Sequence, residues 1–156
     1  MDALEELRAI YAEVDAVLAG FTCDASSDCC HFARTGREPY PSAVEVAELA
    51  RAVRARGGPP KRSKRSLALA DERRCVLLGE NGKCSVYASR PFGCRTYFCE
   101  RGHGPVGEAP PPLRGGDIGR LSRDIAELSA RFDPRDPGPR PLSKVTARPG
   151  WESRGR

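Results

Sequence analysis

Seven cysteines in two groups constrain this chain of 156 residues more than any other feature. They are Cys23, Cys29 and Cys30 in a first group and Cys75, Cys84, Cys94 and Cys99 in a second. An odd number of thiols cannot pair completely within one chain, and the first residues lack the basic start and apolar block of a secretory signal. We therefore expect a cytoplasmic protein whose reduced cysteines bind metal or do redox chemistry rather than form disulfides.

The composition leaves little material for a hydrophobic core. Hydrophobic residues make up 39% of the chain and aromatic residues 6%, whereas glycines and prolines number 16 and 14. A chain with this much loop needs a cross-link or a metal to complete a stable fold. A run of about eighteen apolar residues, the length of a membrane-spanning helix, is absent, so we expect no membrane partner.

Three segments have the apolar spacing of amphipathic helices. The predicted buried faces are Leu4, Leu7, Tyr11, Val14 and Leu18 in residues 3–18, Val46, Leu49, Ala50 and Val53 in residues 42–56, and Ile118, Leu121, Ile125, Leu128 and Phe132 in a third helix after residue 116. Ser42 is the expected N-cap of the second helix, because Glu45 three positions later completes a capping box. These segments predict a mostly α-helical fold.

The cysteines are expected on irregular segments between the helices. Residues 21–41 are rich in turn-forming residues and predict a loop that carries the first cysteine group. Two short apolar runs on either side of Asn81-Gly82 predict a small β-hairpin, which brings Cys75 and Cys84 near each other.

The segment after the hairpin predicts a second cysteine-bearing turn. Pro91 suits the first turn of a helix, so a short helix or irregular turn is expected to carry Cys94 and Cys99. Residues 102–116 hold nine glycines or prolines in fifteen positions and predict a loop.

We expect one domain followed by a tail. Residues 1–132 are predicted to form a single cysteine-cluster domain that is stapled by a metal. Residues 133–156 are rich in proline and arginine and offer little to bury, so they predict a disordered tail in which Trp151 is loosely held.

The cysteine spacing favours ligands that converge from separate segments. Neither group contains C-x-x-C, which disfavours a simple zinc ribbon, but a tetrahedral site sets no rule for sequence order. Four thiolates suit Zn²⁺ or an iron-sulfur cluster. Consecutive side chains diverge, so one of Cys29 and Cys30 is a packing cysteine, an alternate ligand or part of a second site. His31 and His103 are either an extra ligand or, more simply, solvated loop histidines.

The second cysteine group carries a resemblance to a known family. Its residues Cys84, Ser85, Val86, Tyr87, Arg90, Pro91, Cys94 and Arg95 match the pattern C-x-I-Y-x-x-R-P-x-x-C-R, with valine in place of isoleucine. In this pattern the chain resembles the YkgJ family of cysteine-cluster proteins, whose domain is described as zinc- or iron-chelating. The resemblance covers about residues 20–100 and implies metal binding.

The first cysteine group departs from the family pattern at one position. The family reads C-x2-C-x2-C-C, and Cys23, Cys29 and Cys30 align with it, whereas Ser26 stands where the second cysteine belongs. Cys99 lies beyond the usual pattern, and we infer that it replaces the missing ligand.

Arginines and aromatic rings surround the second cysteine group. Arg90 and Arg95 are expected either to balance thiolate charge or to pair with the acidic first helix. Phe92, Tyr97 and Phe98 are expected to belong to the core, where they also keep water from a metal.

These features predict a cysteine-ligated metal-binding protein, with an iron-sulfur cluster slightly favoured over zinc because thiols are in surplus. One alternative is a nucleic-acid or ribosome-binding module with a structural zinc, in which the basic residues 51–65 bind the polyanion. Another is a cluster-dependent redox enzyme that works with a partner and uses Cys23, Cys29 or Cys30 as a reactive thiol. No self-contained catalytic motif such as G-x-S-x-G or H-E-x-x-H is present, so enzyme activity stays open.

Overall fold

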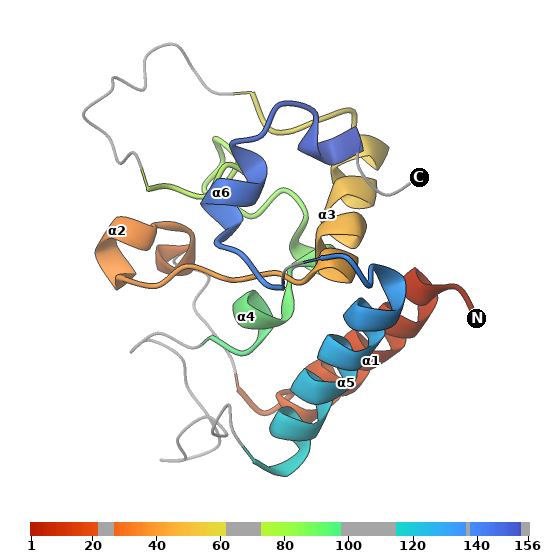
Figure 1. Cartoon of the computed structure of the whole chain (residues 1–156). Coiled ribbons are helices and arrows are strands. Elements are labelled where there is room, and N and C mark those ends of the chain that lie inside the picture. Colours follow the sequence, from red (N-terminus) through yellow and green to blue (C-terminus); the bar gives the residue numbers. More distant parts are fainter. Residues whose placement is uncertain (22–26, 62–72, 98–114, 137, 154–156) are drawn as a thin grey trace.

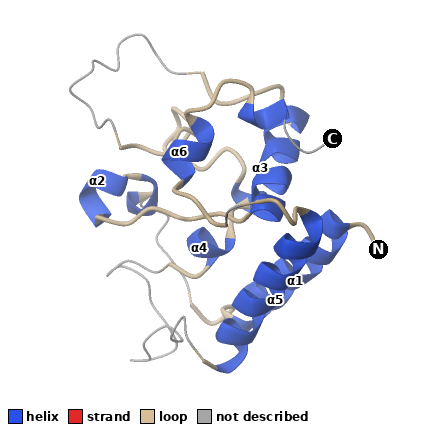
Figure 2. Cartoon of the chain, viewed as in Figure 1, coloured by secondary structure: helices blue, strands red, loops and turns tan. Residues whose placement is uncertain are grey.

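The computed structural model describes residues 1–21, 27–61, 73–97, 115–136 and 138–153. The helices and 3-10 turns (η) in these ranges are α1 (Ala3–Val17), η1 (Asp28–Cys30), α2 (Phe32–Thr35), α3 (Ala43–Ala55), η2 (Tyr87–Ser89), α4 (Phe92–Arg95), α5 (Gly116–Phe132), α6 (Leu142–Thr146) and η3 (Trp151–Ser153). The predicted mostly α-helical fold is confirmed (Figures 1 and 2).

The two long outer helices, α1 and α5, lie side by side and run in opposite directions (Figure 1). Their facing side chains form one hydrophobic cluster, which also takes in Val44 from α3. Arg120 and Arg131 of α5 pair with Glu13 and Glu6 of α1 at 3.0 and 2.6 Å. The helical spacing in the sequence therefore predicted both helices, although Phe132 at the end of α5 is 38% exposed rather than buried.

Helix α3 lies between two hydrophobic clusters. It begins with the predicted capping box, in which the backbone N–H of Ser42 donates to Glu45 Oε2 at 2.8 Å. The other cluster contains Leu49, Ala50 and Val53, each 0% exposed, while Val46 from the predicted stripe is half-buried at its edge. Full burial of one such aliphatic side chain stabilises the fold by roughly 1.5–3 kcal/mol.

The predicted β-hairpin is wrong. The Asn81-Gly82 turn is present, with Gly82 at φ 73°, but the structure forms a single bridge between Leu78 and Cys84 and no sheet in the described residues. Consecutive side chains of a strand point to opposite faces, whereas Leu77 and Leu78 are both buried, at 2% and 6% exposure. The segment around Leu77 and Leu78 is therefore a series of turns, and both leucines pack in the core.

The predicted disordered tail is wrong for residues 138–153. This segment forms α6 and η3 and inserts Leu142, Val145 and Trp151 into the cluster around α3, with Trp151 only 4% exposed. The backbone N–H of Leu142 donates to the Pro39 carbonyl at 3.0 Å. Three apolar side chains with fixed partners are enough to hold this proline-rich stretch, and its sequence has too little periodicity to reveal them.

Several predictions fall outside the described residues. These are the loop at 102–114, most of the basic linker, the start of the cysteine loop and the last residues of the tail. Across the parts of the chain that the structure describes, no helix combines the length and the apolar character needed to cross a bilayer.

Candidate metal centre

Backbone pairing joins the two cysteine groups. The N–H of Cys75 donates to the carbonyl of Cys30 at 2.7 Å, and the N–H of Phe32 donates to the carbonyl of Arg73 at 3.0 Å. Between these bonds, His31 and Arg74 form an isolated antiparallel bridge. Residues 45 positions apart in sequence are thereby held as neighbours.

The turn around Asn81-Gly82 adds Cys84 to the same neighbourhood. Cys84 and Leu78 form an isolated antiparallel β-bridge, and the N–H of Ser85 donates to the carbonyl of Leu77 at 2.9 Å. Cys75 is a member of the hydrophobic cluster around α3, and Cys30 and Cys84 pack against that cluster. The expected approach of Cys75 and Cys84 therefore occurs without a hairpin.

Cys94 comes from the short helix α4, which Pro91 begins as the sequence predicts. The first N–H of this helix, on Phe92, donates to Glu45 Oε1 at 2.7 Å, so α3 holds α4 in place. Gly93 allows a close approach, because a side chain there would meet Cβ of Pro39 at 3.3 Å. The glycine that weakens the helix by propensity thus lets α4 pack closely against Pro39.

Three of the thiols resist ionisation. Burial raises the pKa of Cys75 to about 11, and it also raises the pKa of Cys84 and, more strongly, of Cys94. Negative charge on neighbouring cysteines raises each pKa further. The pKa of Cys84 is raised by Cys29, and that of Cys75 is raised by Cys84 and Cys29. The pKa of Cys94 is raised by Cys75, Cys29 and Cys84. Ionisation of one thiol in this cluster therefore opposes ionisation of its neighbours, which reflects how near these cysteines lie to one another.

The adjacent pair Cys29 and Cys30 behaves differently from the other thiols. A hydrogen bond from Cys30 to the Cys29 sulfur lowers the pKa of Cys29 to about 7, against burial, and the Arg90 guanidinium lowers it further. The same bond, together with burial and the nearby thiolates, raises the pKa of Cys30. Cys29 is exposed and Cys30 is half-buried, but the hydrogen bond holds their sulfurs together, so the expected divergence of these consecutive side chains is not found.

The structure places five of the seven predicted ligands and leaves two outside its described ranges. Cys29, Cys30, Cys75, Cys84 and Cys94 are free thiols. Cys23 and Cys99, like His103, lie outside the described residues. Among the residues that are described, no three His, Cys, Asp or Glu side chains form a ready-made metal-holding group.

A divalent cation nevertheless fits the chemistry of these donors. Five thiols from four separate segments lie within electrostatic reach of one another in largely apolar surroundings. Metal binding requires thiolates, and a bound cation stabilises them against both burial, which is the main cause of the raised pKa values, and the charge of neighbouring thiolates.

Arg90 and Arg95 chiefly serve the acidic first helix. Arg95, 4% exposed, donates to Asp15 Oδ2 at 2.5 Å and stacks over the Tyr11 ring at 4.0 Å. Arg90 approaches Asp15 at 3.7 Å, and its charge also lowers the pKa of Cys29 and opposes the rise at Cys84. Arg95 thus forms the expected ion pair with the first helix, whereas Arg90 both approaches that helix and acts on the charge of the thiols.

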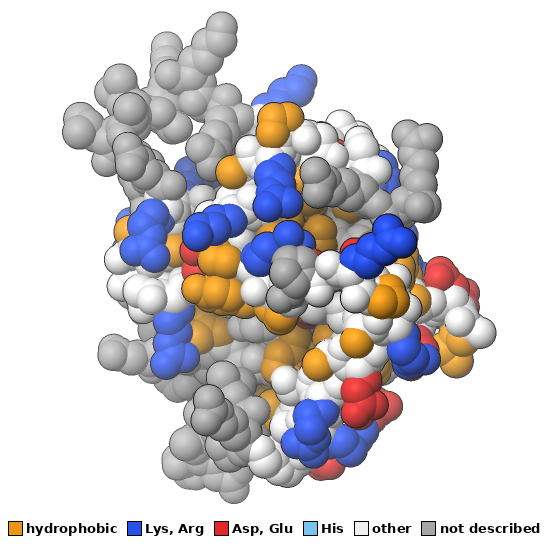
Figure 3. All heavy atoms as spheres, in the orientation of Figure 1, with side chains coloured by type: hydrophobic (Ala, Val, Ile, Leu, Met, Phe, Trp, Pro, Cys, Tyr) orange, Lys and Arg blue, Asp and Glu red, His pale blue; other side chains and the backbone are white. Residues whose placement is uncertain are grey.

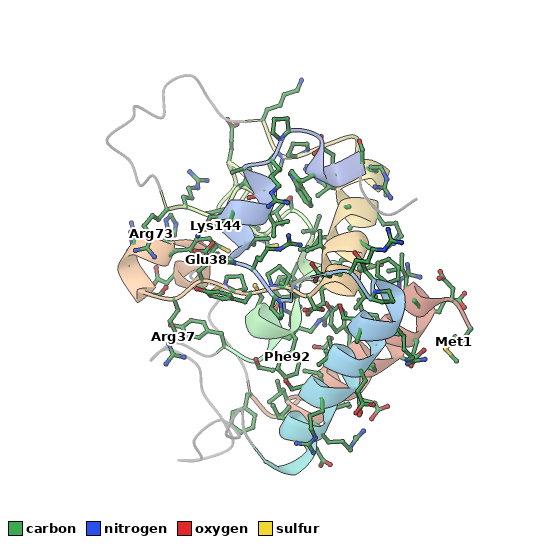
Figure 4. The ribbon with its side chains drawn as sticks, in the orientation of Figure 1. Met1, Arg37, Glu38, Arg73, Phe92 and Lys144 are labelled. Carbon is green, nitrogen blue, oxygen red and sulfur yellow. The ribbon has the colours of Figure 1, made fainter. Side chains whose placement is uncertain are left out.

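The described aromatic residues next to Cys94, Phe92 and Tyr97, have partners in other parts of the fold. Phe92, which is labelled in Figure 4, packs against the cluster between α1 and α5. Tyr97 lies near the guanidinium of Arg37. The described apolar surroundings of Cys30, Cys75 and Cys84 come instead from the α3 cluster, which includes Phe32 and Val86. Phe98 lies outside the described residues.

Sequence reasoning missed the buried carboxylate of Glu48. Its side chain is 2% exposed and binds Arg8 at 2.9 Å, Arg51 at 2.7 Å and the Ser89 hydroxyl at 2.8 Å. Burial raises its pKa, but these three donors outweigh burial and lower the pKa to about 2. Ser89 precedes α4, so the bond ties the Cys84–Cys94 segment to α3. The spacing of Glu45 and Glu48 on one helix face was the available signal.

Converging thiols on a helical frame define a cysteine-rich domain of the metal-chelating type. A family model described as "CxxCxxCC: Putative zinc- or iron-chelating domain" matches residues 22–108, more than half of the chain. The chain belongs to this family, which confirms the cysteine-cluster resemblance. Comparisons with curated proteins and with solved structures find no match.

Proposed function

We propose that the protein binds a zinc or iron centre through Cys75, Cys84, Cys94 and one member of the Cys29 and Cys30 pair. The observation that carries this proposal is the convergence of cysteines through backbone pairing of Cys75 with Cys30 and of Cys84 with Leu78, within a stretch that matches a zinc- or iron-chelating family. Cys23 and Cys99 remain predicted ligands, and they supply the further thiols that a cluster of several irons would use.

We favour an iron-sulfur cluster over zinc, because seven cysteines exceed the need of one tetrahedral ion. A zinc ion would cross-link the turns, whereas a cluster would add one-electron chemistry. In either case the protein side chains bind the ion, exclude water with the α3 cluster and orient the turns through Glu45 and Glu48.

The deciding experiment is elemental analysis and an ultraviolet-visible spectrum of untagged protein purified without oxygen. Several irons per chain with visible charge-transfer absorbance would support the cluster. One zinc per chain in a colourless sample would support a structural zinc site. Protein that keeps neither metal after supply of both during expression would contradict the proposal.

A redox role with a partner is the second candidate, favoured by the exposure of Cys29 beside four more buried thiols. Alkylation of the metal-loaded protein, followed by mapping of the modified residues, tests it. Selective modification of Cys29 is expected. Equal and slow modification of all seven cysteines would exclude this role.

The contacts of the described part of the basic segment, residues 51–61, favour polyanion binding less than metal binding. Arg51 pairs with Glu48, Arg54 donates to the carbonyl of Glu152, and Arg56 donates to the carbonyl of Gly58. These internal contacts occupy the cations of α3 and its end. Binding of nucleic acid through residues 51–65 stays a prediction, and its test is a steep loss of affinity with salt.

A further inference from the structure

A small pocket lies on the far side of α3 from the α1–α5 pair, where the C-terminal segment folds over the core. Its volume is about 90 Å³, and its lining residues are Val46, Arg140, Lys144, Val145, Arg148 and Trp151. We call it the Trp151 pocket. Apart from Val46, these residues lie beyond the stretch that matches the family model.

The floor of the Trp151 pocket is apolar and its rim is cationic. Trp151 and Val145 are 4% and 8% exposed, and Val46 is half-buried beside them. Lys144 and Arg148 are exposed, so their charged ends lie in water while their stems cover apolar surface. Figure 3 shows Lys and Arg side chains over α6 with apolar atoms between them.

The lining contains three cations and no acid. Arg140 pairs with Asp136 at 2.8 Å, but its Nε is buried without a partner in the structure. Arg54 adds a fourth cation near the pocket, because it donates to the Glu152 carbonyl in η3. Three acids lie nearby, namely Asp136 paired with Arg140, Glu38 near the start of α6 and Glu152 next to Trp151, so the four cations keep a small excess of positive charge (Figure 4).

The size and lining of the pocket select its occupant. A volume near 90 Å³ suits one aliphatic side chain, and surrounding cations attract acidic neighbours of that side chain. Nucleic acid fits less well, because the Trp151 ring is buried and offers no open face for a base to stack on. We propose that the Trp151 pocket binds an acidic peptide segment of a partner protein, with one aliphatic side chain as its anchor.

The pocket provides its own probe, because Trp151 is the single tryptophan of the chain. The full-length, metal-loaded protein is titrated with a short synthetic peptide in which leucine is flanked by glutamates. A saturable change in tryptophan emission is expected, and calorimetry gives a second measure of binding. A peptide with glycine for leucine should bind about tenfold more weakly, since it loses the burial of one aliphatic side chain. A peptide with lysines for glutamates should bind at least about fivefold more weakly, since it loses more than one exposed ion pair, each worth up to about fivefold, and gains repulsion.

Paired variants locate the binding. Lys144→Gln combined with Arg148→Gln should lower the affinity for the acidic peptide at least about fivefold. Arg123→Gln, which removes an exposed cation from α5, should leave its affinity unchanged. Metal content should be the same in all three proteins, which separates this proposal from the metal-binding function.

Three results would overturn the proposal. They are absence of saturable binding by both measures at millimolar peptide, equal binding of the lysine peptide, and unchanged affinity in the Lys144→Gln and Arg148→Gln protein. A short oligonucleotide that alters Trp151 emission where the acidic peptide does not would assign the surface to nucleic acid instead.

Discussion

The carboxylate of Glu45 accepts a hydrogen bond from the backbone N–H of Phe92 at 2.7 Å, across 47 residues of sequence. The same carboxylate caps the start of α3 through Ser42 and accepts the Tyr11 hydroxyl at 3.0 Å. One side chain thus fixes the first turns of two helices and contacts a third, and α4 carries one of the proposed ligands. Burial and Glu45 together raise the pKa of Tyr11, which keeps that hydroxyl a donor.

Glu45→Gln should lower the free energy of unfolding by about 1–3 kcal/mol, because it replaces a charged acceptor of several buried bonds with a neutral amide. Urea denaturation followed by circular dichroism measures the loss. Glu127→Gln on the exposed side of α5 is the matched control and should change stability by less than about 0.5 kcal/mol. Equal stability of the two variants would contradict a structural role for Glu45.

Glu48 should make stability depend on acid pH. Its pKa is lowered from 4.5 to about 2 in the folded protein, so its contribution is complete above pH 4.5 and is lost as the pH falls toward 2. That shift corresponds to a contribution on the order of 3 kcal/mol. The difference in Tm between the natural protein and Glu48→Gln should be largest above pH 5 and should shrink toward pH 2. A difference that is constant across this range would show that the Glu48 charge does not contribute.

Cys84→Ser should reduce the metal bound per chain, with affinity at least about tenfold weaker, because serine is a poor ligand for zinc or thiophilic iron. Elemental analysis after dialysis against a mild chelator measures the loss. Cys94→Ser should have the same effect, although it lies on a different segment.

Ser85→Ala is the matched control for Cys84→Ser, since Ser85 is its neighbour and its buried hydroxyl has no partner in the structure. Removal of an unsatisfied hydroxyl should leave metal content unchanged and should alter stability by at most about 1 kcal/mol, in the stabilising direction. A loss of metal in Ser85→Ala as large as in Cys84→Ser would mean that disturbance of the turn, and not the thiol, controls binding.

Trp151→Ala should destabilise the protein by about 3–5 kcal/mol, because it empties a site in the cluster around α3. Thermal unfolding measures the change, and Trp151→Phe, which keeps a ring, should lose less than half as much. The natural protein should also show blue-shifted emission that moves to longer wavelength on unfolding. Emission already typical of water-exposed tryptophan in the native state would contradict the buried position.

The elements predicted from sequence are those with local signals. The Ser42 and Glu45 capping box and the three- to four-residue apolar spacing define α1, α3 and α5 within a residue or two. Pro91 likewise marks the start of α4. Each of these signals acts between residues of one helix, so a single stretch of sequence is enough to read it.

The remaining features depend on contacts between distant residues. Glu48 resembles a solvated helix position until Arg8, 40 residues earlier, and Ser89, 41 residues later, are placed against it. Trp151 sits among prolines, and its burial follows from a gap beside α3 that its own neighbours do not encode. For the candidate site, the sequence predicted the convergence of its segments, whereas the pairing of Cys30 with Cys75 needed the fold.

The interlocking of α3 with both ends of the chain defines the smallest piece that should be expressed for study. A fragment cut at the limits of the family match, 22–108, would lack α1, α5 and α6. Val44 and Leu49, both 0% exposed, would then face water on opposite sides of α3. Such a fragment should aggregate even when metal is supplied to its cysteines. The stretch that matches the family model is thus smaller than the unit that folds.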